Sequence, residues 1–83
     1  MQKEEVWAVD PRRIAAFFRE QPDAAPTESG FAFCGCRVSV TALEPRRVAG
    51  LALPQTRVVF EGEEASVIPI YRRFLLRFLS AGG

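Results

Sequence analysis

The strongest pattern of hydrophobic and polar positions lies near the C-terminus. Between residues 63 and 80, the large apolar side chains fall within one half of a helical wheel and the arginines within the other half. The apolar half holds Val67, Ile68, Ile70, Tyr71, Phe74, Leu75, Phe78 and Leu79, while Leu76 lies on the polar side. Because Pro69 would remove one helical hydrogen bond, the pattern predicts a regular helix that begins at about Pro69 after a looser turn.

A second amphipathic segment follows Asp10. An aspartate directly before a proline is a good helix start, since the carboxylate accepts from first-turn amides and proline has no amide to leave unpaired. The helix is expected over about residues 11–20, with Ile14, Phe17 and Phe18 on its buried side. The preceding residues 4–9 are rich in β-favouring side chains and predict a first strand or an extended arm.

Alternation of apolar and polar residues predicts the strands. Over residues 31–43, Cys34, Cys36, Val38, Val40 and Ala42 share one face, which indicates one continuous strand. Residues 56–61 predict another strand, with Val58 and Phe60 on its buried face. Residues 21–30 predict a surface loop, residues 44–47 a turn and Pro54 a break, whereas residues 48–53 fit either a strand or one helical turn.

The order of these elements predicts a single α+β domain over residues 1–83. We expect a small two-layer sandwich, in which two helices cover one face of a three- or four-stranded, mainly antiparallel sheet. The opposite sheet face, with Arg37, Ser39, Thr41, Arg57 and Val59, would look to solvent.

Composition and charge narrow the functional classes. The chain contains no histidine, which removes the commonest general base and metal ligand, and its net charge is only +1. It also lacks a glycine-rich phosphate-binding loop, and its acidic residues show no paired arrangement typical of general acid–base catalysis. We therefore expect a protein that is not an enzyme and that binds no cofactor.

Two cysteines, Cys34 and Cys36, flank a single glycine. Two thiolates can chelate a soft ion, but a closed tetrahedral site needs four ligands. We expect free thiols that both point inward with Val38 and Val40, and no metal.

A small domain without a disulfide framework or a signal peptide indicates the cytoplasm, and no apolar run is long enough to cross a membrane. The basic residues are all arginine except Lys3, which favours a GC-rich bacterial source.

The first functional hypothesis is an interaction or accessory domain. The large apolar side chains of the final helix cover half of its circumference. This arc is wider than the arc that a single helix ordinarily buries in so small a domain. We therefore expect Phe74, Phe78, Tyr71 and Leu76 to contact a second copy or another protein. A sheet edge is the other predicted route to a homodimer.

An alternative hypothesis is weak nucleic-acid binding. Its candidate residues are Arg37, Arg57, Arg72, Arg73 and Arg77, whose guanidinium groups could pair with phosphates. Arg73 and Arg77 are four residues apart and would share one face of the final helix.

A third hypothesis comes from the C-terminal residues Ser80-Ala81-Gly82-Gly83. This ending resembles the tails of small β-grasp sulfur carriers and ubiquitin-like modifiers, whose terminal carboxylate is activated by adenylation. The resemblance implies that Gly83 would carry the adenylate or thiocarboxylate and that the glycines would let the tail enter a narrow channel. Those families reach the tail from a strand, whereas this chain reaches it from a helix, after which glycine is also an ordinary stop.

Overall fold

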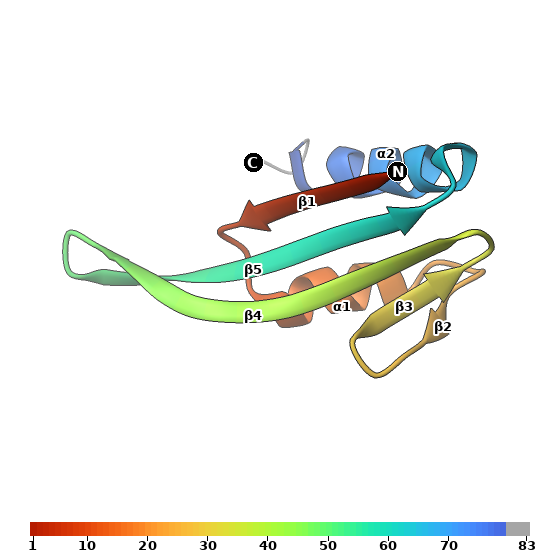
Figure 1. Ribbon diagram of the computed structural model, residues 1–83. Coiled ribbons are helices and arrows are strands. Elements are labelled where there is room, and N and C mark those ends of the chain that lie inside the picture. The colour runs from red at the N-terminus through yellow and green to blue at the C-terminus, as the bar shows by residue number, and fades with distance from the viewer. Residues whose placement is uncertain (80–83) are drawn as a thin grey trace.

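Two helices cover one face of a five-stranded antiparallel sheet in the computed structural model, which describes residues 1–79 (Figure 1). The elements are β1 (Gln2–Trp7), α1 (Pro11–Arg19), β2 (Ala25–Pro26), β3 (Gly30–Phe33), β4 (Cys36–Val48), β5 (Leu51–Gly62) and α2 (Glu64–Leu79). The strand order is β1-β5-β4-β3-β2, and every pair of neighbours is antiparallel. The predicted α+β class with two helices is confirmed, but the sheet has more strands than expected.

The additional strands arise where the sequence suggested one strand and a loop. The expected continuous strand over residues 31–43 is a hairpin, because Phe33 pairs with Cys36 and the two residues between them form a turn. Gly35 has φ +77°, a conformation that glycine adopts without strain. The predicted loop over residues 21–30 also contains β2, which pairs with β3 through only two residues.

A long ribbon replaces the turn predicted at residues 44–47 and the break predicted at Pro54. Strand β4 continues to Val48, and a shift of register between Leu43 and Arg46 accommodates Pro45, since a bulge tolerates a residue without an amide hydrogen. The turn lies instead at residues 49–50. Residues 44–54, which we call the arm, are all exposed and extend from the rest of the sheet (Figure 1).

Helix α2 begins at Glu64, earlier than the predicted start at Pro69. Its first turn is held by the carbonyl of Glu63, which accepts from the amides of Ser66 and Val67, each at 2.9 Å. Pro69 lies just beyond this turn and removes a single helical hydrogen bond, so it does not end the helix. The start of α1 is as predicted, with the Asp10 carboxylate accepting from the Arg12 amide at 2.8 Å.

The core lies between the helices and the sheet. Phe18, Phe60 and Phe74 are fully buried, and Phe18 stacks on Phe74 with ring centroids 5.6 Å apart. Phe17 and Ile14 complete the inner side of α1 as the sequence predicted. Neither helix within residues 1–79 has the length and apolar character that crossing a membrane would require.

Candidate functional site

The end of α2 is the described part of the chain that lies next to the C-terminal tail. Leu79 is the last residue of the helix, and residues 80–83, on which the carrier hypothesis rests, lie outside the described residues. The side chain of Leu79 is 62% exposed and that of Leu76 is 69% exposed. Together with exposed Arg72, these residues occupy neighbouring positions on the outward side of the helix, a set that we call the outer stripe.

The inner side of the same helix is fixed by aromatic packing against β1. The rings of Trp7 and Phe74 meet edge to face at 5.2 Å, and those of Trp7 and Phe78 lie 6.3 Å apart. Such offset and edge-on geometries are those that aromatic pairs prefer. The last two turns of α2 are therefore seated on the sheet, so the outer stripe has a defined position relative to the fold.

A polar contact between Tyr71 and Glu5 also holds α2 against β1. The Tyr71 hydroxyl donates to one oxygen of the Glu5 carboxylate, and the Trp7 indole donates to the other oxygen at 2.8 Å. The hydrogen bond to Glu5, its largest cause, raises the pKa of Tyr71 above its ordinary value. The Lys3 ammonium lies over the Tyr71 ring, 4.9 Å from its centroid. Tyr71 thus joins α2 to β1 of its own chain.

The residues predicted to contact a partner divide between the interior and the surface. Phe74 is fully buried and Phe78 is only 9% exposed, because α1 and the sheet cover most of the apolar half of α2 that the sequence suggested was too wide. These two aromatic rings are consequently not available to a partner. Of the predicted set, Leu76 is the residue with a large exposed side chain.

The arginines of the nucleic-acid hypothesis lie on two sides of the molecule. Arg37 and Arg57 extend from the sheet face that the helices leave open, whereas Arg72, Arg73 and Arg77 belong to α2 on the covered side.

Several of these guanidinium groups have partners within the chain. Arg57 lies 3.7 Å from a Glu4 oxygen, Arg73 lies 3.8 Å from an Asp23 oxygen, and Arg77 lies over the Phe78 ring. The structure does not bring the five arginines together into one strip.

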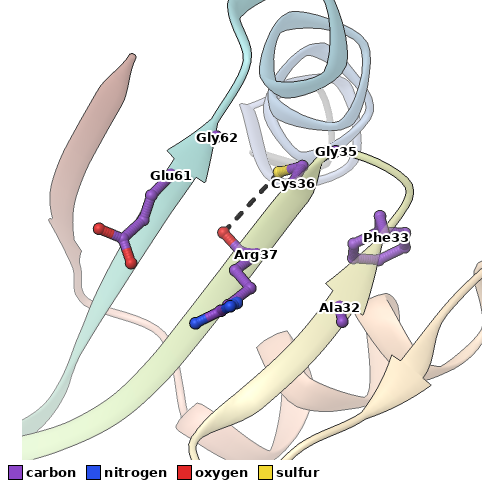
Figure 2. Close-up of a pocket in the computed structure, with 7 residues that line it drawn as sticks. All are labelled: Ala32, Phe33, Gly35, Cys36, Arg37, Glu61 and Gly62. Carbon is purple, nitrogen blue, oxygen red and sulfur yellow. Dashed lines mark hydrogen bonds between the residues drawn. The ribbon is translucent and has the colours of Figure 1, made fainter.

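A hollow of about 390 Å³ lies beside the β3–β4 turn (Figure 2). Arg37 and Glu61, cross-strand neighbours on β4 and β5, line it together with Ala32, Phe33, Gly35, Cys36 and Gly62. The Cys36 thiol is buried and donates to the Arg37 carbonyl at 3.7 Å, and burial raises its pKa. A thiol with a raised pKa is a poor nucleophile at neutral pH, so this hollow carries no activated group.

The two cysteines do not share one environment, which corrects the prediction that both point inward. Cys36 is buried, but Cys34 is exposed because it lies in the turn that interrupts the expected strand. Within residues 1–79, no group of three or more histidine, cysteine or acidic side chains is placed to hold a metal ion.

Sequence reasoning missed the exposed leucine at the end of α2. The helical wheel places Leu79 in its apolar half, at the margin next to Leu76, and the structure shows this side chain exposed. Its marginal position was the available signal. Sequence reasoning also missed the exposed apolar residues of the arm, Val48, Leu51 and Leu53, because it placed a turn at the base of the arm.

The fold and the terminal site define a small α+β domain in which a glycine-ended tail follows an amphipathic helix. Residues 2–83 match the family model described as archaeal MoaD-like protein, and the chain therefore belongs to this family. The match includes the tail as well as the described fold. The description gives no support for the bacterial source inferred from arginine usage. No curated protein matches the chain.

Proposed function

We propose that this chain is a small sulfur carrier that acts through its C-terminal carboxylate and is not itself an enzyme. The observation that carries the proposal is the family match, which extends over the fold and through Gly82-Gly83. The proposal makes the third functional hypothesis the preferred one. The helix that precedes the tail distinguishes this chain from carriers that reach their tail from a strand.

The proposed chemistry takes place on the carboxylate of Gly83. In the first step this carboxylate attacks the α-phosphorus of ATP, so that an acyl-adenylate forms and pyrophosphate leaves. In the second step a hydrosulfide equivalent attacks the acyl carbon, AMP leaves, and the thiocarboxylate remains. Both steps need the active site of a partner enzyme, because the described residues supply no phosphate-binding loop and no activated nucleophile.

The sequence of the tail suits entry into such an active site. Gly82 and Gly83 carry no side chain, so the terminal carboxylate can approach a nucleotide through a channel too narrow for larger residues. The partners in this proposal are proteins: an adenylating enzyme, and an acceptor that takes the sulfur. The proposed compartment is the cytoplasm.

The test is mass spectrometry of the intact chain after incubation with an adenylating enzyme of the ubiquitin-activating type, ATP and sulfide. We expect the mass to rise by the difference between one sulfur and one oxygen, and deletion of Gly83 to abolish the change. Leu51→Ser is the matched control, since Leu51 is 66% exposed and belongs to the arm, away from the tail in the sequence. An unchanged wild-type mass, or modification that survives the deletion, would contradict the proposal.

A further inference from the structure

The short tail restricts where an activating enzyme can touch this chain. Residues 80–83 are four in number and, at no more than about 3.6 Å each, span at most about 14 Å beyond Leu79. An enzyme that holds the Gly83 carboxylate in its active site must therefore bring its own surface close to the end of α2. This step rests on the proposed carrier function.

The outer stripe lies within that distance. Leu76 is one turn before Leu79, or about 5 Å along the helix axis, and Arg72 is one further turn back. The exposed fractions of Leu76 and Leu79 are both above 60%, so the helix presents two large apolar side chains at the base of the tail. The packing of Phe74 and Phe78 against Trp7 holds the inner side of the helix in place, and a partner would meet a surface that is already formed.

The arginines of α2 indicate which charged group a partner surface would carry. Arg73 lies near Asp23, and Arg77 lies over the Phe78 ring. Arg72 is exposed and takes part in none of the ion pairs found within residues 1–79. Its guanidinium group is therefore available to form charge-assisted hydrogen bonds with a carboxylate of a bound protein.

We infer that the enzyme that adenylates Gly83 docks on the outer stripe, Arg72, Leu76 and Leu79. Its complementary surface is a shallow apolar depression with at least one carboxylate at the rim. Contacts of this kind, a few apolar side chains bordered by a charge pair, contribute to affinity and orientation rather than to the chemical step. The docking surface and the reacting carboxylate thus lie at the same end of the molecule.

The experiment measures ATP–pyrophosphate exchange by an adenylating enzyme of the ubiquitin-activating type as the concentration of the carrier is varied. For Leu76→Ser and Leu79→Ser, we expect the carrier concentration at half-maximal rate to rise at least tenfold, while the maximal rate stays within twofold. Arg72→Glu should raise the same concentration, and the increase should shrink at high salt because the lost contact is electrostatic. Leu51→Ser is the matched control, since Leu51 is 66% exposed but belongs to the arm.

Failure of this inference can be distinguished from failure of the carrier function. The chain without Gly83 should support no exchange but should inhibit exchange by the wild-type chain, because its outer stripe is intact. Loss of exchange on deletion of Gly83, with no effect of Leu76→Ser or Leu79→Ser, would overturn the docking surface and leave the carrier function standing. Exchange that persists without Gly83 would overturn the carrier function. Circular dichroism melting of each variant checks that a loss is not due to unfolding.

Discussion

Phe74 is the residue on which the inner side of α2 depends. Its ring contacts Trp7 from β1, Phe18 from α1 and Phe60 from β5. Because one side chain joins both helices to the sheet, its removal would leave a cavity bordered by several elements. Leu76, two residues later on the same helix, has most of its side chain in solvent.

We expect Phe74→Ala to lower the free energy of unfolding by about 3–5 kcal/mol, which combines lost burial with the cavity left behind. That loss is a large part of the roughly 5–15 kcal/mol typical of small domains. Leu76→Ala should change the same quantity by less than about 0.5 kcal/mol. Urea unfolding followed by circular dichroism measures both, and equal effects of the two substitutions would contradict the assignment of the inner and outer sides of α2.

The Asp10 carboxylate stabilises the N-terminus of α1, and this stabilisation depends on pH. Hydrogen bonds from the Arg12 side chain and amide lower the pKa of Asp10 from 3.8 to about 2. A carboxyl group whose pKa is depressed by folding stabilises the fold fully above its unfolded pKa, and this contribution disappears as the pH falls through the folded value.

The melting temperature should therefore carry an Asp10 contribution that is lost between about pH 4 and pH 2. Asp10→Asn keeps a capping oxygen but cannot titrate, so this part of the pH dependence should be absent from the variant. The comparison uses thermal melts of both proteins across this range. Identical pH profiles would show that Asp10 does not titrate with a lowered pKa.

At the scale of the elements, the arm shows a local conflict between sequence and backbone. Its turn contains Ala49 at φ +50° followed by Gly50 at φ +83°. Two successive residues with positive φ fit the two-residue hairpin turn that suits the twist of a β-ribbon, but alanine is unfavourable at the first position.

Replacement of Ala49 by asparagine should stabilise the arm by about 1 kcal/mol, because asparagine tolerates the left-handed conformation. Hydrogen exchange of the amides in residues 44–54 should slow about fivefold, while the amides of α1 keep their rates. Ala49→Val is the opposing variant, since a β-branched residue is disfavoured at positive φ, and it should accelerate exchange in the arm. Equal rates in all three proteins would contradict the turn geometry.

The elements whose pattern is set by burial could be predicted from the sequence. Helix α1, with its Asp10 cap, and the buried face of β5 at Val58 and Phe60 are where the alternation and the capping residues placed them. Two of the errors occurred at Gly35 and Pro45, because glycine and proline can either end a strand or be accommodated within the sheet. Gly35 turns the chain between two strands, and Pro45 is absorbed by a bulge instead of ending a strand.

The candidate site was only partly predictable for a related reason. A helical wheel assigns a direction to each side chain but does not give the width of the layer that will cover it. Phe78 is covered because Trp7 and Phe17 reach it, whereas Leu79, one residue later, extends past this cover. The resemblance of residues 80–83 to carrier tails supported only the third hypothesis, and the match of residues 2–83 to the family model is what makes that hypothesis the preferred one.

At the scale of the whole molecule, the arm gives the fold an elongated outline, with extents of 42, 27 and 22 Å. The sheet around Arg57 has neighbours on both sides, since Arg57 pairs with Val6 of β1 and with Thr41 of β4. Arg46 and Arg47 in the arm pair with Leu53 and Ala52 across the ribbon, and both arginines are exposed.

Limited digestion with trypsin should therefore cut first after Arg46 or Arg47. Opening the arm locally costs less free energy than opening the central strands, and proteolysis follows the population of the open form. Cleavage after Arg57 should appear only under conditions that unfold the whole chain. Mass spectrometry of the early fragments identifies the sites, and an early cut after Arg57 would show that the arm is not the least stable part of the sheet.

The N-terminal amine also has a structural role that matters for handling the protein. The Met1 ammonium donates to the Gly62 carbonyl at 2.8 Å, at the junction between β5 and α2. An affinity tag fused before Met1 would replace this ammonium group by an amide, and a tag after Gly83 would block the terminal carboxylate. A fluorophore or an epitope is therefore better attached in the exposed arm, where the side chain of Leu51 is 66% exposed. A label at this position leaves the hydrogen bond of the Met1 ammonium group unmodified, together with the Gly83 carboxylate on which the proposed function depends.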